Sequence, residues 1–541
     1  MADASPQIKS MITMDRLQDI YSTVSQHVVA HAPAMNSRQQ KISISAAVAL
    51  VAFYTVYKVV TPPKKLRHIP SMGFFSYLNA FLRGKQLHEI SKNVVLPHAV
   101  NVDNGVYLRF DILGWTVHIA RPEAAKRFLL KSDIFPKADL ISERGDTLFG
   151  KFVFNRNIIT LNGDDWKAQR KVANPAFHRA MPVELFGKLT KKTLKKMEEE
   201  MDGGTLNFHD VTERYTLDVI GLAGFEFDFG AIENPKSEWV DRYQRLIEAT
   251  FNPWFIAFPS LDMQYRFLFP SRKRLHREMD TFLDKMTQVI THKRELLNHQ
   301  KNSVPESERD ILTLMIEAEK NGEGSMTNEE LQNNLLVFFI AGHDTTALAL
   351  SYTAYYLAVN PDVQRKARDE AIRVLGDAPE DVMPTIEQTR QLTYINMVIK
   401  ETLRMNPPLA TLPVREASED TDLCGTFIPK GTRTFLDLYE IQHNPTVWKD
   451  PETFKPERFK PGGEAEELAG SGMSWLPFSN GSRQCIGLNF SLVEQRVFLP
   501  MLLRKYEWHL PEDSIHKERI QTMGLAVIKP KDLKLTFKKR Y

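Results

Sequence analysis

A single thiol stands out as the residue best placed for chemistry. Cys485 lies in the stretch 478–487 (FSNGSRQCIG), next to an arginine and just before an apolar helical segment. Backbone N–H groups, a nearby cation and a helix N-terminus all favour the ionised form of a thiol. A thiolate is a soft anionic ligand, so this loop predicts a metal site. The alternative is a buried free cysteine that packs as a small hydrophobic residue.

A second group of reactive residues occupies residues 341–346 (AGHDTT) within a long apolar run. Ala341 and Thr345 are four positions apart and therefore share one face of a helix. A small residue beside a hydroxyl leaves room for a bound molecule, and Asp344 could connect that hydroxyl to solvent through water. The alternative for Thr345 is a hydroxyl bonded to its own helix backbone. We interpret His343 as a packed or solvent-facing residue and not as a metal ligand.

These two segments resemble those of the cytochrome P-450 family of haem-thiolate monooxygenases. The family pattern F-x-x-G-x-R-x-C-x-G is matched in the cysteine loop, and A/G-G-x-D/E-T is matched at residues 341–345. Further on, the chain contains the E-x-x-R and P-E-R-F patterns of the family. The resemblance covers about residues 66–541. The matched positions are Phe478, Gly481, Arg483, Cys485, Gly487, Ala341, Gly342, Asp344, Thr345, Glu401, Arg404 and Arg458.

The resemblance implies haem b as cofactor, with Cys485 as the axial ligand of the iron. Two buried propionates need paired donors. The resemblance assigns this task to cations in the W-x-x-x-R pattern, ahead of residues 428–431 and in the cysteine loop. It also implies that Glu401, Arg404 and Arg458 form a buried network that supports the fold around the haem. The expected haem-contacting residues are Cys485, Trp166, Arg170, Arg415, Arg483, Phe478 and Ala341.

The implied reaction inserts one oxygen atom of O₂ into a C–H bond, with Thr345 and Asp344 managing the protons. The sequence shows no dinucleotide-binding glycine pattern after a strand and no flavin-sized extension. Electrons from NADPH must therefore come through a separate membrane-bound NADPH-cytochrome reductase, with cytochrome b5 as a further candidate donor. Lys167 and Lys171 are predicted to help dock an acidic electron donor.

The substrate is expected to be bulky and apolar, because the segments that line the pocket in the family are aromatic and aliphatic here. Our leading hypothesis is steroid hydroxylation, followed by oxidation of a fatty acid or a foreign hydrophobic compound. Two other classes stay open, a peroxide-rearranging haem-thiolate isomerase and a non-catalytic haem-binding sensor. The segments concerned are residues 135–154, 251–258 and 409–414, the region of Phe338 and Ala341, and residues 523–525.

The N-terminal region predicts a membrane anchor. Residues 1–41 are polar and expected to be poorly ordered, whereas residues 42–60 are apolar and long enough, at about 28 Å as a helix, to span a bilayer. Residues 61–65 contain two prolines and two lysines and form a hinge. The basic residues that follow the apolar stretch place residues 66–541 in the cytosol, anchored to the endoplasmic reticulum membrane.

The remaining chain predicts one mainly helical domain with a small β-rich region. A hairpin is expected over residues 106–112 and 115–119, a helix from Pro122, and another over 188–201. Thr327 and Glu330 form a capping box that begins a helix of about eight turns, up to Asn360. The resemblance implies a triangular prism with the haem between this long distal helix and the cysteine loop.

The composition is that of an intracellular globular protein. In 541 residues, 43% are hydrophobic and 25% charged, and a net charge of +3 is too small to indicate nucleic-acid binding. With two cysteines, Cys424 and Cys485, no disulfide framework is implied.

Overall fold

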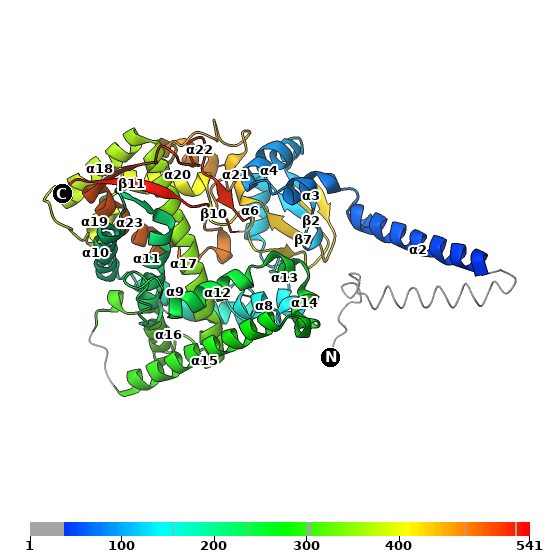
Figure 1. Ribbon diagram of the computed structural model, residues 1–541, viewed down its shortest axis with the longest axis horizontal. Helices are drawn as coiled ribbons and strands as arrows, with labels where there is room; N and C mark the ends of the chain where they lie inside the picture. Colours follow the sequence, from blue (N-terminus) through cyan, green and yellow to red (C-terminus); the bar gives the residue numbers. More distant parts are fainter. Residues whose placement is uncertain (1–36, 154, 237, 300–303, 471, 525–526) are drawn as a thin grey trace.

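A computed structural model of the protein describes residues 37–153, 155–236, 238–299, 304–470, 472–524 and 527–541. Most of the predicted N-terminal polar segment lies outside these residues, as do Phe154 and Leu525 of the expected substrate pocket. The fold is mainly helical with small sheets, which confirms the predicted class. Figure 1 shows the helices packed around α17 (Asn328–Val359), with the largest sheet on the side from which α2 (Ser37–Val60) projects.

After α2, the helices that precede α17 in the chain lie between residues 74 and 320. They are α3 (Phe74–Leu82), α4 (Leu87–Ile90), α5 (Leu96–Val100), α6 (Pro122–Leu130), α7 (Leu140–Arg144), α8 (Leu148–Val153), α9 (Gly163–Arg179), α10 (Val183–Glu200), α11 (Phe208–Phe225), α12 (Glu238–Thr250), α13 (Pro253–Ala257), α14 (Pro259–Met263), α15 (Pro270–His299) and α16 (Ile311–Lys320). The helices after it are α18 (Pro361–Leu375), α19 (Ile386–Gln391), α20 (Thr393–Met405), α21 (Leu438–His443), α22 (Glu464–Ala469) and α23 (Leu488–Lys505). Short 3₁₀ or π segments are η1 (Lys64–Leu66), η2 (Ser91–Val95), η3 (Arg266–Leu268), η4 (Glu306–Glu308), η5 (Pro456–Phe459) and η6 (Gly481–Arg483).

The largest sheet has the order β1-β2-β7-β4, in which β2 and β7 are parallel and the other pairs antiparallel. Its first two strands are the predicted hairpin, with Phe110 opposite Trp115. The strands are β1 (Val106–Asp111), β2 (Gly114–Ile119), β3 (Thr205–Asn207), β4 (Arg415–Glu416), β5 (Thr421–Leu423), β6 (Thr426–Ile428), β7 (Arg433–Leu436), β8 (Tyr506–His509), β9 (Thr522–Met523), β10 (Lys529–Pro530) and β11 (Lys534–Lys539).

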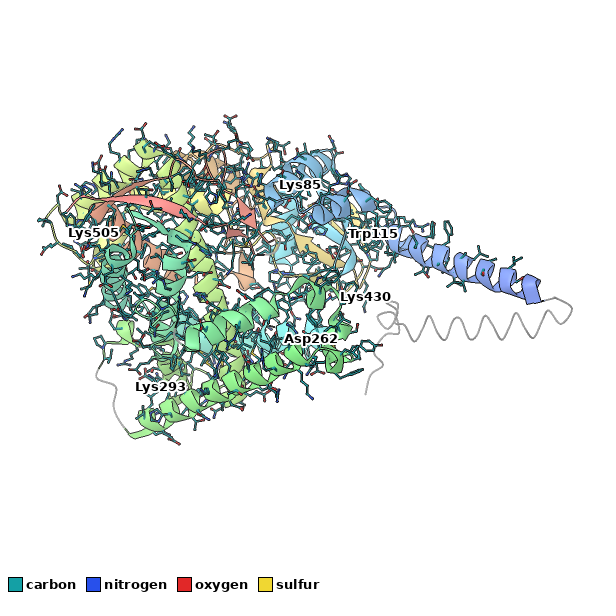
Figure 2. All side chains as sticks on the ribbon, in the orientation of Figure 1. Lys85, Trp115, Asp262, Lys293, Lys430 and Lys505 are labelled. Carbon is teal, nitrogen blue, oxygen red and sulfur yellow. The ribbon has the colours of Figure 1, made fainter. Side chains whose placement is uncertain are left out.

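The predicted apolar N-terminal stretch is helical and stands apart from the rest of the protein. Helix α2 begins at Ser37, five residues before the predicted start, and ends at Val60 as predicted, because Pro62 and Pro63 follow. None of the α2 residues whose side chains are described is buried. At its base the indole nitrogen of Trp115 donates to the carbonyl oxygen of Val59 at 2.9 Å (Figure 2).

The long helix α17 is stabilised at its start by the predicted capping box. The backbone N–H of Glu330 donates to the Thr327 hydroxyl at 3.1 Å, and the Thr327 N–H donates to the Glu330 carboxylate at 2.9 Å. The helix is long and apolar enough to cross a membrane, but most of it is buried inside the protein. It is therefore the central core helix, and it ends where Asn360 precedes Pro361.

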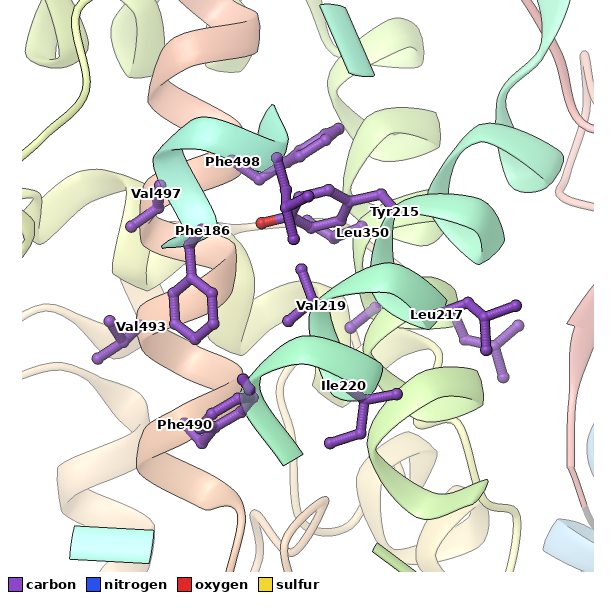
Figure 3. Packing of buried hydrophobic residues seen from close by; sticks show 14 of the residues in the cluster. Phe186, Tyr215, Leu217, Val219, Ile220, Leu350, Phe490, Val493, Val497 and Phe498 are labelled. Atoms are coloured by element: carbon purple, nitrogen blue, oxygen red, sulfur yellow. The ribbon is translucent and has the colours of Figure 1, made fainter. Parts of the chain in front are cut away.

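The core beside α17 is built from α10, α11 and α23. In Figure 3 Phe186 of α10 and Phe490 of α23 pack edge to face, with ring centroids 5.1 Å apart. The ring centroids of Tyr215 in α11 and Phe498 in α23 lie 4.7 Å apart. Helix α11 approaches α17 closely, since a Cβ added at Gly342 would lie 2.9 Å from the Ile220 side chain. This packing fixes α17 relative to the helix that follows Cys485.

Candidate active site

The cysteine loop is a closed turn between Phe478 and α23. The backbone N–H of Cys485 donates to the carbonyl oxygen of Phe478 at 2.9 Å. Two residues of the loop have left-handed backbones, Ser479 with φ 57° and Gly481 with φ 71°. A Cβ at Gly481 would lie 3.1 Å from the carbonyl oxygen of Leu129 in α6. Glycine is therefore required at this position both for its conformation and for the close approach of α6.

As a residue Cys485 is exposed, which counts against the alternative of a buried residue that packs as a small hydrophobe. Protein surrounds it closely enough that burial raises the pKa of the Cys485 thiol, against the opposing effects of the Gly487 N–H and the Arg170 guanidinium. The sequence predicted Arg483 as the cation beside the thiol, but the cation that acts on it is Arg170 from α9. A raised pKa means that the loop alone does not ionise the thiol, whereas a bound metal cation would do so.

Four cations gather on one side of the cysteine loop. Arg415 is buried and donates to the carbonyl oxygens of Phe128 and Phe135 at 3.3 Å each. Burial lowers the pKa of Arg415 to about 10. The others are Arg483, Arg170 and Lys137.

Desolvation also lowers the pKa of Arg483, Lys137 and Arg170. It lowers the pKa of Arg483 to about 9, helped by the charges of Arg415 and Arg170. It lowers the pKa of Lys137 well below its ordinary value, helped by Arg415 and Arg483. Arg170 donates to the carbonyl oxygen of Gln484 at 2.9 Å and likewise has a pKa lowered by burial.

This cluster is suited to two carboxylates that the chain itself does not provide. Within the described part of the chain, no carboxylate lies within ion-pair distance of Lys137, Arg170, Arg415 or Arg483. Arg415 is buried and the other three cations are half-buried, and cations removed from water without a carboxylate partner are costly. The site therefore fits a dianionic ligand such as the two propionates of a haem. Sequence reasoning missed Lys137, because a lone lysine has no pattern of its own. Its pairing with Arg415 through a β-bridge appears only in the folded chain.

Trp166 supports one of these cations. The guanidinium carbon of Arg483 lies 3.8 Å from the centroid of the Trp166 ring. Arg483 also donates to the side-chain oxygen of Asn162 at 3.1 Å. In the W-x-x-x-R pattern on α9, Trp166 therefore stacks against Arg483. Arg170 of the same pattern contacts the cysteine loop.

The helix α17 faces the same region as the cysteine loop. Phe177 of α9 lies between them, 3.9 Å from a Cβ placed at Gly487 and with its ring centroid 4.8 Å from that of Phe338. The Thr346 hydroxyl of α17 lies 3.0 Å from the Ser491 hydroxyl of α23. The predicted distal helix and the predicted metal loop are thus brought together.

Accessibility varies sharply along the chemistry-bearing part of α17. Ala341 is exposed and Thr345 half-exposed, whereas His343, Asp344 and Thr346 are buried. Because Ala341 and Thr345 are four residues apart, they share one face of α17, and neighbouring side chains do not cover this face fully. The Thr345 hydroxyl donates to the carbonyl oxygen of Ala341 at 2.5 Å, which is the backbone-bonded arrangement considered from the sequence.

The Asp344 carboxylate contacts His343 and Lys529, and no hydrogen bond to Thr345 is among its described contacts. Its carboxylate lies 3.2 Å from Nδ1 of His343 and 3.4 Å from Nζ of Lys529. Burial raises the pKa of Asp344, but hydrogen bonding from His343 and the charge of Lys529 outweigh it and the net pKa is lowered. His343 is packed, with its ring nitrogen 3.3 Å from the Tyr243 hydroxyl, which confirms the interpretation that it is a packed histidine.

The predicted buried network is present. Glu401 and Arg404 of α20 are fully buried, and the Arg404 guanidinium donates to the Glu401 carboxylate at 2.7 and 2.9 Å. Arg458 of η5 lies 3.2 Å from the same carboxylate. Glu401 thus pairs with both guanidinium groups and joins α20 to η5, and Arg458 forms a further ion pair with Glu464.

Comparison with known proteins agrees with this site. A family model described as Cytochrome P450 matches residues 113–537. The chain is 30% identical over 397 residues to cytochrome P450 3A29 of Sus scrofa, covering 70% of this chain and 75% of that protein. It is 30% identical over 379 residues to cytochrome P450 3A18 of Rattus norvegicus (66% and 72%) and 28% identical over 393 residues to cytochrome P450 3A5 of Homo sapiens (70% and 74%). The chain belongs to the cytochrome P450 family, whose members carry haem iron with a thiolate ligand, and it is a monooxygenase of the oxidoreductase class.

Proposed function

We propose that the protein hydroxylates a hydrophobic substrate, with a steroid as the leading candidate, and that Cys485 ligates the iron of haem b. When bound, the haem supplies the activation of O₂ and its thiolate ligand pushes electron density toward O–O cleavage. The observation that carries the proposal is the uncompensated cluster of Lys137, Arg415 and Arg483 beside an accessible thiol.

The residues around Cys485 would hold the cofactor in the arrangement inferred from the fold, between α17 and the cysteine loop. Arg415 and Arg483 would pair with the propionates, with Lys137 adding a third positive charge. The N–H of Gly487 and the guanidinium of Arg170 would stabilise the thiolate. Phe478 and Trp166 would contact the macrocycle as apolar neighbours.

The residues of α17 would make room for bound O₂ and supply protons to it. Ala341 leaves space beside the Thr345 hydroxyl, and this hydroxyl could rotate from the Ala341 carbonyl to donate a hydrogen bond to a bound ligand. Asp344 would supply protons to Thr345. Changing Thr345 to Ala should uncouple NADPH consumption from product formation. An unchanged product yield would count against the monooxygenase mechanism.

Substrate class is proposed from the pocket-lining segments, which are aromatic and aliphatic. The alternative substrates are a fatty acid or a foreign hydrophobic compound. An optical titration of the purified protein with progesterone, and separately with lauric acid, tests this through the shift of the haem band that follows loss of iron-bound water. A shift with progesterone alone supports the steroid, whereas a shift with lauric acid alone refutes it. Absence of any haem band would refute the role of Cys485.

Attachment to the endoplasmic reticulum membrane through residues 42–60 is supported by exposed apolar surface. In α2, Leu50 is 68% and Phe53 71% exposed. Trp254 of α13 and Phe267 of η3 are also strongly exposed, and α13 lies on the side from which α2 leaves the body (Figure 1). A chain lacking residues 1–60 should lose carbonate-resistant association with microsomes, and retained association would contradict the anchor.

The electron donor would be an NADPH-cytochrome reductase, with cytochrome b5 as a further donor. Lys167 and Lys171 of α9 are both exposed, and they flank the segment that carries Arg170 to the cysteine loop. Lys167 is paired with Asp164 at 2.9 Å, an exposed pair that is easily exchanged for a partner's carboxylate. This face is therefore the candidate docking surface for an acidic donor.

A further inference from the structure

Arg144 is a buried cation at the end of α7 that joins two of the segments expected to line the substrate pocket. It belongs to residues 135–154, and its Nη1 donates to the carbonyl oxygen of Ile256, in residues 251–258, at 2.6 Å. Arg144 is 8% exposed. The same two segments also meet through Phe149 and Phe251, which pack edge to face with ring centroids 5.4 Å apart. A charged side chain is therefore held where the two segments meet.

The described part of the chain provides no carboxylate within ion-pair distance of Arg144. Glu143 and Asp111 lie near enough to act on its charge, but each has other partners. Glu143 pairs with Arg433, and Asp111 accepts a hydrogen bond from the Thr116 hydroxyl at 2.7 Å. Burial outweighs the attraction of the two carboxylates, so the pKa of Arg144 is lowered.

Most of the hydrogen-bonding capacity of the Arg144 guanidinium is unused by the described residues. A guanidinium carries five N–H donors, and the described contacts of Arg144 include one hydrogen bond from this group, to a neutral carbonyl oxygen. Donors that are removed from water without gaining an acceptor are costly. The position therefore suits a ligand that carries an acceptor oxygen.

The backbone at Arg144 is fixed by contacts that do not involve its guanidinium. The Thr147 hydroxyl donates to the Arg144 carbonyl oxygen at 2.7 Å, and a Cβ at Gly150 would lie 1.9 Å from that oxygen. The Leu148 N–H donates to the buried Asp262 carboxylate at 2.8 Å, which ties α8 to α14. Arg144 is therefore presented by a rigid turn, and this turn does not depend on the charge of Arg144.

We propose that the Arg144 guanidinium binds an acceptor oxygen of the substrate, a ketone or a carboxylate, and so determines how an otherwise apolar molecule lies in the pocket. The inference rests on the proposed function, because it names the polar group carried by the substrate of that same site. A ketone oxygen accepts from the N–H groups as a neutral partner, whereas a carboxylate accepts from two of them as a charged pair. Either partner replaces the water that the guanidinium loses on burial.

The test is an optical titration of the haem-loaded full-length protein with two pairs of ligands that differ in oxygen. The pairs are progesterone with pregnane, its hydrocarbon skeleton, and lauric acid with dodecane. Arg144→Met keeps an unbranched side chain and removes the donors. It should weaken binding of the oxygen-containing ligand by about tenfold to a hundredfold, and should change the dissociation constant of the matching hydrocarbon by less than about twofold. A selective loss with progesterone identifies a ketone as the partner, and a selective loss with lauric acid identifies a carboxylate.

The matched control is Arg266→Met. Arg266 of η3 also donates to the turn after α7, at the carbonyl oxygen of Asp146, over 2.9 Å. Its loss should leave the preference for oxygen-containing ligands unchanged. Arg144→Lys keeps the charge without the planar fork, so its affinity for these ligands should lie between those of the wild type and Arg144→Met. Arg144→Leu should reproduce Arg144→Met, and it serves if the methionine variant does not load haem.

Thermal unfolding without ligand separates substrate binding from a structural role. Loss of one hydrogen bond and relief of a desolvated charge oppose each other, so Arg144→Met should unfold within about 2 °C of the wild type. A Tm that falls by more than about 5 °C in Arg144→Met, but not in Arg266→Met, would mark Arg144 as a structural cation and overturn the inference.

The inference and the proposed function fail in different ways. If the wild type binds the oxygen-containing ligand and Arg144→Met weakens both members of the pair equally, or neither, the inference is wrong and the proposed function stands. If progesterone and lauric acid both leave the wild-type haem band unmoved, the proposed substrate class and the inference are both wrong. If the affinities change as expected but the wild type forms no product with NADPH and reductase, the proposed hydroxylation is wrong and the assignment of Arg144 stands.

Discussion

Removing the buried charge of Arg415 should change stability in opposite directions with and without haem. Burial lowers the pKa of Arg415 to about 10. At about 1.4 kcal/mol per pKa unit, this fall corresponds to a destabilisation of about 3 kcal/mol, since the guanidinium stays charged at neutral pH. Two hydrogen bonds, to Phe128 and Phe135, offset it by about 1 kcal/mol each.

The variant Arg415→Met should therefore stabilise the apoprotein by about 1 kcal/mol. In the haem-loaded protein the same change removes a charge-assisted bond to a propionate, so stability should fall by about 1.5–3 kcal/mol. The difference between the effects of Arg415→Met on the free energy of unfolding of the two forms measures how much the ligand's carboxylates stabilise the protein through Arg415.

The assay is guanidinium chloride unfolding of the apoprotein and the haem-loaded protein, followed by tryptophan fluorescence. Arg127→Met is the matched control, because Arg127 on α6 forms an exposed pair with Asp422 at 3.4 Å and should change either form by less than about 0.5 kcal/mol. The reasoning would be refuted if Arg415→Met lowered the midpoint of both forms, or raised it in both.

Three further predictions concern the network, the pH dependence and the docking face. Changing Glu401 to Ala leaves the buried Arg404 without its carboxylate and should cost about 3–5 kcal/mol, measured as a lowered Tm with the haem-loaded protein, whereas an unchanged Tm would contradict the network. Burial, reinforced by the nearby Asp437, raises the pKa of Glu440 to about 7, so its stabilising effect is present below pH 4.5 and is lost as pH rises through 7. Glu440→Gln should therefore gain Tm relative to wild type between pH 5 and pH 8, and a constant difference would argue against the shift. Reversing both Lys167 and Lys171 to Glu should weaken reductase affinity and flatten its salt dependence, and unchanged affinity would exclude this face.

The long helix α17 shows how much the sequence specifies locally. Thr327 and Glu330 mark its start, and Asn360 before Pro361 marks its end, because capping and proline effects act within one turn. The hairpin at residues 106–119 is also set locally, because its turn contains Gly114, whose φ of 91° favours glycine. The start of α2 was placed five residues late because polarity at Ser37 and its neighbours hides a continuous helical backbone.

The candidate role of Cys485 as a metal ligand was also proposed from its neighbours in the chain, but its electrostatic environment could not be predicted from them. The adjacent Arg483 turns away to stack on Trp166, and the cation that acts on the thiol comes from α9. Proximity in sequence says that a charge is near the backbone of a residue, and only the packed side chains decide which way it points.

Sequence by itself singled out Cys485, Asp344 and Thr345 as candidates for the iron and oxygen sides, because short local motifs that contain them resemble those of the family. Only the tertiary structure assembled Lys137, Arg415 and Arg483 into one cationic cluster, and only it brought Lys529 to Asp344. These groups are far apart in the chain, so their meeting depends on long-range packing. Their pKa values depend on the burial that this packing creates, which no local pattern encodes.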